Sequence, residues 1–354
     1  MKKDLPIYLD SASTTKVDSR VLEVMIPYFS KYYGNASSNH VFGKKTHEAI
    51  NNARAHVADI INCNSKEIIF TSGATESINL ALKGYVESNI DKGNHIITAK
   101  TEHKAVLSTC DYLETKGFEV TYLDLDENGL ISMDQLRASI KKNTLLVVIM
   151  YVNNETGVIQ SVKEIGEIAR ERNIIFFCDA TQAVGKIVVD IENDNIDMLC
   201  FSGHKLNGPK GIGVLYKRKD IELTPLIHGG GQENGLRGGT YNTPLIIGLG
   251  RACEIAILEF EEKTQKLTNK RKEAEVFYEG NNIGTVNFKN VKTTPHIISI
   301  TLNNFEAEEY LMLKSKEFTA STGSACNSEI IEISHVLKAI GIKNKKHIIR
   351  ISIG

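Results

Sequence analysis

Lys205 has the clearest chemical potential in this chain, because it stands in a polar, glycine-rich turn directly after an apolar segment, residues 196–202. If that segment is a strand of an open parallel sheet, the turn lies at the edge where such sheets bind ligands. A lysine buried there can form a Schiff base, since desolvation or a neighbouring cation lowers its pKa toward neutrality. A lone lysine is more often an inert surface residue, so other motifs must decide between these interpretations.

A carboxylate ends a second apolar segment, residues 174–179, at the same expected edge. Asp179 can face the pyridine nitrogen of a cofactor and keep it protonated, because an opposite charge favours the charged form. A cationic ring then accepts electrons from a carbanion. Gln182 can reach an oxygen of the same ring. Both residues can also cap the next helix, with Asp179 as the N-cap and Gln182 as its partner, and the two roles do not exclude each other.

Small hydroxyl residues and a glycine join a third strand to a helix in residues 70–77. Backbone N–H groups at a helix N-terminus form an anion site, and Gly73 and Thr75 let a phosphate approach closely. Ser202 and His204 can add contacts from the lysine turn. An ordinary N-cap has the same composition. Neither G-x-G-x-x-G nor G-x-x-x-x-G-K-[ST] occurs, so this phosphate does not belong to a dinucleotide or a nucleoside triphosphate.

Two further residues follow strands on the same rim. His103 comes after the segment 95–100, where an imidazole can stack on a ring and move protons. Asn154 follows the segment 144–152 and can bind a substrate carboxylate or a ring oxygen. A lone histidine that opens a helix is more often a surface residue, and Asn followed by Gly also favours a plain turn.

Short apolar segments alternate with helix-like segments from about residue 44 to residue 216, which predicts parallel strands joined by helical crossovers. The expected strands are residues 67–71, 95–100, 118–123, 144–152, 174–179, 196–202 and 213–216. Apolar spacing predicts helices over residues 45–61, 75–88, 104–116 and 162–172. After residue 239, a charged helical stretch (244–279) and strands at 296–302, 317–321 and 348–353 indicate a smaller α+β domain.

The composition limits the classes of partner. The chain has 354 residues, with 42 Lys+Arg against 43 Asp+Glu, and no long single-sign run suggests direct binding of nucleic acid. No apolar stretch approaches the ~20 residues of a membrane span, so no membrane partner is expected. The six cysteines form no C-x-x-C pair. We therefore expect a cytoplasmic protein with free thiols and no metal site.

Several motifs, in order along the chain, resemble those of the cysteine desulfurases, which are pyridoxal-phosphate (PLP) enzymes of the aminotransferase class V superfamily. The motifs are Tyr-Leu-Asp (8–10), Thr-Ser-Gly-Ala-Thr-Glu-Ser (71–77), Thr-Glu-His-Lys-Ala-Val (101–106), Val-Asn-Asn-Glu-Thr-Gly-Val (152–158), Asp-Ala-Thr-Gln (179–182), Ser-Gly-His-Lys (202–205), Gly-Gly-Gly-Gln-Glu (229–233) and Gly-Ser-Ala-Cys (323–326). The resemblance implies the α/β fold type I of PLP enzymes. Its large domain, with a mostly parallel sheet, would be residues 15–240, and a smaller α+β domain would combine 1–14 with 241–354.

The resemblance also implies a role for each candidate residue. The PLP ring would be bound by the Schiff-base lysine Lys205, by Asp179 at the nitrogen, by Gln182 at the oxygen and by His103 stacked on its face. The phosphate would be held by Ala74, Thr75, Ser202 and His204. Thr240 would contact the phosphate bound in the other subunit of a homodimer. The substrate carboxylate would be bound by Asn154 and Arg350.

Cys326 decides the reaction, because the superfamily supports transamination, elimination and sulfur transfer on one fold. It stands among small polar residues in the segment 321–328, where its thiol can be exposed, whereas the other five cysteines sit in apolar patterns typical of a core. We expect its thiolate to take the sulfur of L-cysteine as a persulfide and to release alanine. The alternatives are a selenocysteine lyase or related PLP enzyme, and a non-catalytic protein that organises sulfur-handling partners.

The sequence leaves the sulfur acceptor open. The family supplies iron–sulfur scaffolds, tRNA-thiolation proteins and DNA-phosphorothioation proteins, and the segments 34–36 and 229–233 resemble the last branch. Ser11, Ser13, Ala36 and Tyr151 depart from the usual family pattern. The chain ends at Gly354, directly after the strand that bears Arg350, where relatives usually continue with another helical segment.

Overall fold

The structure is a computed structural model that describes residues 5–322 and 334–354. Its larger sheet has seven strands in the order β2-β8-β7-β6-β5-β3-β4. Only β8 runs antiparallel to its neighbours within that sheet. The strands are β2 (Ile68–Thr71), β8 (Gly213–Lys217), β7 (Met198–Ser202), β6 (Ile175–Asp179), β5 (Thr144–Met150), β3 (His95–Ala99) and β4 (Glu119–Leu123).

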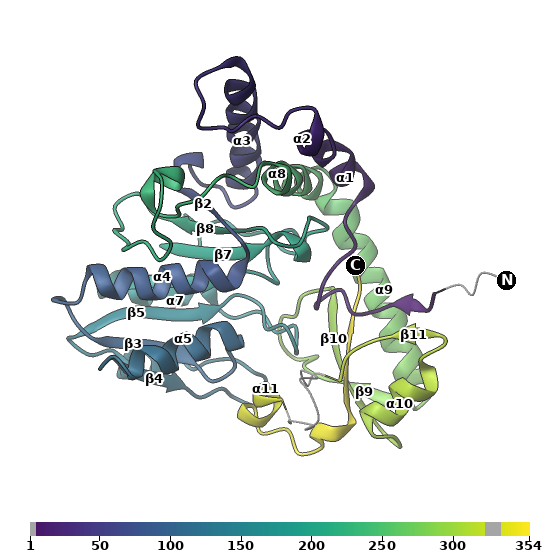
Figure 1. Ribbon diagram of the computed structural model, residues 1–354. Coiled ribbons are helices and arrows are strands. Elements are labelled where there is room, and N and C mark those ends of the chain that lie inside the picture. Colours follow the sequence, from purple (N-terminus) through teal and green to yellow (C-terminus); the bar gives the residue numbers. More distant parts are fainter. Residues whose placement is uncertain (1–4, 323–333) are drawn as a thin grey trace.

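The central strands are buried on both faces, because helices cover both sides of the sheet (Figure 1). In β5 all seven residues are buried, and its side chains alternate between two cores. Val147 and Ile149 pack toward α7 and α8, whereas Leu146 and Val148 pack toward α4 and α5. The helices of this part are α1 (Ser19–Met25), α2 (Pro27–Ser30), α3 (Val41–Asp59), α4 (Ala74–Ser88), α5 (Lys104–Glu114), α6 (Met133–Ser139), α7 (Val162–Glu171) and α8 (Thr243–Leu258).

A second, smaller part has its own core. Three antiparallel strands in the order β12-β10-β9 carry buried isoleucines that pack with Leu267 and Tyr278 of the long helix α9. A two-stranded parallel ladder, β1 with β11, lies beside them. The elements are β1 (Ile7–Tyr8), α9 (Phe260–Gly280), β9 (Gly284–Val286), β10 (Ile297–Leu302), α10 (Ala307–Lys314), β11 (Phe318–Thr319), α11 (His335–Ala339) and β12 (Ile348–Ser352).

The predicted α/β sheet is confirmed, with each expected strand within two residues of its observed bounds in the large sheet. The helical stretch predicted over 244–279 is confirmed, and it consists of two helices, α8 and α9, that meet at Glu259. Glu259 accepts a 2.5 Å hydrogen bond from Arg20, and the two resulting helices serve different cores. Apolar α8 packs with α3 in the core of the large sheet, whereas charged α9 packs on the small sheet. The division at residues 240 and 241 stays a prediction.

Within residues 5–322 and 334–354, no helix is both long enough and apolar enough to cross a lipid bilayer.

Candidate active site

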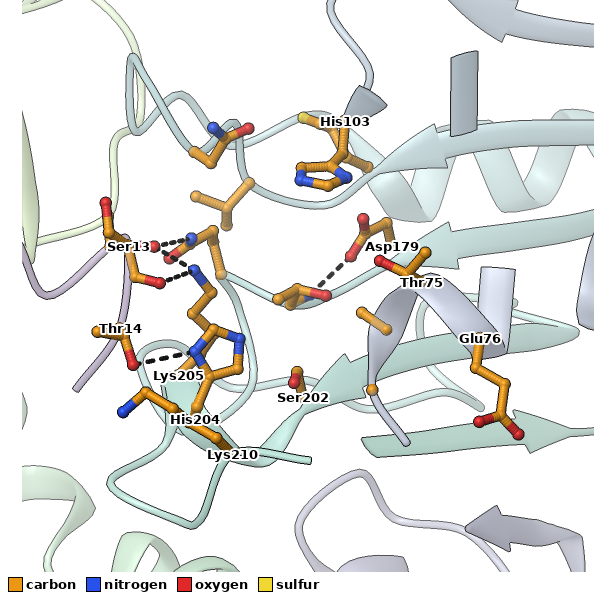
Figure 2. Close-up of a pocket in the computed structure, with 18 of the residues that line it drawn as sticks. Ser13, Thr14, Thr75, Glu76, His103, Asp179, Ser202, His204, Lys205 and Lys210 are labelled. Carbon is orange, nitrogen blue, oxygen red and sulfur yellow. Dashed lines mark hydrogen bonds between the residues drawn. The ribbon is translucent and has the colours of Figure 1, made fainter. Parts of the chain in front are cut away.

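A cavity of about 700 Å³ lies at the carboxyl ends of the large-sheet strands, where the N-terminal segment and β12 reach the sheet. Figure 2 shows that side chains from both parts of the molecule face it. The cavity brings together all the predicted site residues except Thr240 and Cys326, namely Ala74, Thr75, His103, Asn154, Asp179, Gln182, Ser202, His204, Lys205 and Arg350. Cys326 lies outside the described residues.

Lys205 ends the 3-10 turn Gly203–Lys205, which directly follows β7. Its Nζ donates hydrogen bonds to the carbonyl oxygens of Ala12 at 2.5 Å and Ser13 at 2.7 Å. Burial, followed by the nearby Arg350 guanidinium, lowers the pKa of this amine to about 8. Near neutral pH a useful fraction of the amine is therefore unprotonated, which a nucleophilic lysine requires.

Asp179 and His103 face each other across the cavity (Figure 2). Asp179 is buried at the end of β6, and one carboxylate oxygen accepts the N–H of Thr181 at 3.0 Å, so the residue does close the local turn. His103 is the N-cap of α5, because its Nδ1 accepts the N–H of Ala105 at 3.1 Å. That bond leaves the proton of the neutral ring on Nε2. Burial lowers the pKa of His103, with Asp179 opposing the shift.

The N-terminus of α4 forms a cradle for an anion. No side chain of the described residues caps it, so the first N–H groups of the helix are available to a ligand. Gly73 has a φ of 158°. A Cβ on residue 213 would lie 2.5 Å from the Gly73 Cα, so the close contact between these two backbone segments requires glycine at position 213. Burial and Lys205 lower the pKa of His204 to about 4, which leaves a neutral ring beside the cradle. The small residues and free donors fit a phosphate group.

A buried histidine that the sequence did not indicate supports Gln182. The Oε1 of Gln182 accepts from His296 Nε2 at 3.2 Å, and His296 Nδ1 lies 2.6 Å from the Thr294 hydroxyl. The Nε2 of Gln182 donates to the Ala12 carbonyl at 2.9 Å, the same oxygen that accepts from Lys205. This chain of bonds links the small part of the molecule to the lysine. No spacing in the sequence relates His296 to residue 182.

Arg350 is held by three oxygens around the cavity. Its Nη2 donates to Asp10 at 2.7 Å and to the Ser13 hydroxyl at 2.8 Å, and Nη1 donates to the Asn154 carbonyl at 2.9 Å. Its buried Nε has no hydrogen-bond partner among the described residues. Asp10 and Ser13 thus belong to the site, although the sequence predicted only Arg350 and Asn154 there.

Thr240 is exposed and lines a neighbouring hollow of about 220 Å³, which shares Ser72 and Gly211 with the cavity. The expectation for the other cysteines is confirmed, because Cys63 is half-buried and the remaining four described cysteines are buried. Burial raises the pKa of Cys110 to about 12, and it raises the pKa of the other described thiols as well. Burial therefore disfavours the thiolate form of these five cysteines.

Comparison with known proteins agrees with this geometry. The aminotransferase class-V family model matches residues 7–354. The cysteine desulfurase IscS of Neisseria meningitidis serogroup C is 49% identical over 342 residues, which cover 95% of this chain and 84% of that one. The chain belongs to the aminotransferase class-V family, among its cysteine desulfurases.

Solved structures of this family superimpose over almost the whole desulfurase. A NifS-like protein matches with a TM-score of 0.91 at 37% identity, over 99% of this chain and 94% of that one. A structure described as SspA in complex with cysteine matches with a TM-score of 0.88 at 40% identity, over 98% of both chains. The predicted fold type I, the PLP dependence and the desulfurase activity are confirmed.

Proposed function

We propose that Lys205 and Asp179 hold PLP in the cavity and that Cys326 takes the sulfur of L-cysteine and passes it to an acceptor protein. One observation carries the proposal. A buried lysine, a buried carboxylate and an uncapped helix N-terminus converge on one cavity at the carboxyl ends of the strands.

PLP, when bound, supplies an aldehyde and an electron sink. Lys205 would bond to it, because burial lowers the pKa of its amine to about 8. Asp179 would keep the pyridine nitrogen protonated, and His103 would stack on the ring. The N–H groups of Ala74 and Thr75 at the start of α4, with the side chains of Ser202 and His204, would hold the phosphate. Gln182 would offer its second amide hydrogen to the ring oxygen.

The substrate carboxylate would meet Arg350 and Asn154. The Nε of Arg350 is a buried donor without a hydrogen-bond partner in residues 5–322 and 334–354, and an anion would satisfy it. Once the amine of Lys205 is free, it can take the α-proton of cysteine. His103 carries a proton on Nε2 and can return protons to the substrate.

Sulfur transfer requires a thiolate that can reach the substrate. The thiolate of Cys326 attacks the sulfur of L-cysteine, an S–S bond forms and the C–S bond breaks. The electron pair of the broken bond goes to the carbon skeleton, which takes up a proton and leaves as alanine. The five described cysteines are poor candidates for this step because burial keeps their thiols protonated.

The test is Cys326→Ala. The variant should bind PLP with an unchanged visible absorption band, yet form less than about a hundredth of the alanine of the parent enzyme from L-cysteine. Cys63→Ala is the matched control and should keep full activity. Alanine formation at the parent rate by the Cys326 variant would refute the assignment.

We also infer that a second copy of the chain covers α1, α2 and the start of α3. Leu22, Ile26, Phe29, Tyr33 and Val41 expose between 49% and 73% of their surface there. Such an apolar patch is typical of an interface. Thr240, exposed outside the cavity of its own subunit, would then contact the phosphate of the other subunit. Sedimentation velocity should show a dimer that Phe29→Asp with Tyr33→Asp dissociates, and an unaltered dimer would contradict this surface.

The acceptor is an iron–sulfur scaffold, a tRNA-thiolation protein or a DNA-phosphorothioation protein. The enzyme loaded with ³⁵S-cysteine should pass its label to one of these classes, and Cys326→Ala should pass none. The described cysteines are free thiols, which supports a reducing compartment such as the cytoplasm.

A further inference from the structure

A small cavity of about 120 Å³ lies behind the turn that carries Lys205. It is bounded by α9 and the end of α8, by Leu206 and Asn207, which follow Lys205 directly, by the turn after β6 and by Gly354. Four ammonium groups and three apolar side chains line it: Lys186, Lys263, Lys266 and Lys270, with Leu206, Ala256 and Leu267.

Lys186 is the anomaly in this cavity. It is only 8% exposed, yet no hydrogen bond or ion pair reaches its ammonium group within the described parts of the chain. Its position is imposed by the backbone. Its N–H closes a turn onto the Ala183 carbonyl at 2.9 Å, and Gly185 has a φ of 72° where a Cβ would lie 2.1 Å from Leu206. The side chain is nine-tenths buried while its Nζ still meets solvent, so an anion that entered the cavity would find an ammonium group without a partner in the described structure.

The lysines of α9 add to the charge rather than balance it. Residues 263, 266 and 270 are spaced so that they share one face of the helix. Among them, only Lys263 has an ion pair in the described structure, with Glu259 at 3.3 Å. Glu259 is already bonded to Arg20. The side chains that line the cavity therefore carry a net positive charge.

We propose that this cavity binds a phosphate group, either as free inorganic phosphate or as the end of a larger phosphorylated metabolite. A phosphate carries up to two negative charges and several acceptor oxygens, so it satisfies more than one ammonium at once. A volume of about 120 Å³ has room for such a group. The apolar wall formed by Leu206, Ala256 and Leu267 would contact the remainder of a larger ligand.

Calorimetric titration of the PLP-loaded enzyme tests the proposal, because bound PLP keeps added phosphate away from the cradle at α4. Inorganic phosphate, pyrophosphate and ADP are titrated separately at constant ionic strength. We expect saturable binding by the parent enzyme and binding weakened about tenfold or more in Lys186→Met. Tighter binding of ADP than of phosphate would indicate the metabolite, and equal binding would indicate the free ion.

Lys272→Met is the matched control, because Lys272 is exposed on α9 and does not line the cavity. It should bind phosphate like the parent enzyme. Lys270→Met gives a second test if the variant at 186 folds poorly, and it should also weaken binding. The proposal would be overturned if the parent enzyme showed no saturable binding of phosphate. It would also be overturned if the Lys186 and Lys270 variants bound phosphate as tightly as the parent enzyme does.

Discussion

Lys205 and Lys186 lie in two different cavities, and burial shifts the pKa of both amines in the same direction. In both, desolvation lowers the pKa of the amine to about 8. Their surroundings differ. Two carbonyl oxygens accept from Lys205, and Asp179 lies in the same cavity, whereas Lys186 faces three other lysines. Burial therefore makes both lysine amines easier to deprotonate. The neighbouring groups determine whether the lysine acts as a nucleophile, as we propose for Lys205, or binds an anion, as we propose for Lys186.

The largest effect should come from removing the amine of Lys205, and removal of the Lys186 amine is the comparison. Lys205→Ala should lower desulfurase activity on the order of a thousandfold or more, because the cofactor loses its attachment and the substrate loses its base. Lys186→Met should keep activity within about twofold in phosphate-free buffer. Alanine formation from L-cysteine and the visible PLP band measure both variants. A large loss of activity in Lys186→Met would erase the distinction between the two lysines.

A smaller effect should follow from the chain of hydrogen bonds that supports Lys205. His296→Leu leaves Gln182 Oε1 without its hydrogen-bond donor, which should weaken the positioning of Gln182 by about 1–2 kcal/mol. If that loss is felt in the transition state, kcat/KM should fall roughly tenfold. His296→Gln restores a donor and should recover part of the loss. A pH titration of the PLP band separates positioning from folding, because the midpoint should shift in His296→Leu and return in His296→Gln. An unchanged midpoint in both variants would show a purely structural histidine.

The smallest effect concerns stability. Without phosphate, Lys186→Met should unfold at a higher temperature, on the order of 2 °C for each kcal/mol gained, because it removes a charge that is partly desolvated and repelled by Lys263. Between pH 8 and about 10 the parent enzyme should gain stability, since a folded-state lysine with a lowered pKa releases its proton before the unfolded chain does. Lys186→Met should show a shallower gain. Denaturant titrations at several pH values measure the free energy of unfolding of both proteins. If this free energy rose with pH equally steeply in the parent enzyme and in Lys186→Met, the lowered pKa of Lys186 would be contradicted.

Local patterns were enough to predict most of the large sheet and its site. Each apolar segment ends in a residue such as Asp179 or Ser202, and parallel strands bring their carboxyl ends to one edge. The break at Glu259 could not be predicted, because the helical pattern continues through it and only the two separate cores divide it. Asp10, Ser13 and His296 were also missed as partners, since they come from segments remote in the chain from the residues that they contact.

The sequence by itself determined the chemistry, because the types of residue at strand ends and the order of the motifs specify a PLP enzyme that handles cysteine sulfur. Only the tertiary structure decided how each group is held. It joins Gln182 to His296 across the two parts of the molecule, and it joins Arg350 to Asp10, which lies 340 residues away in the chain. It also buries Lys186 among other lysines. The physical reason is that burial and hydrogen bonding depend on contacts between distant segments, which no local pattern encodes.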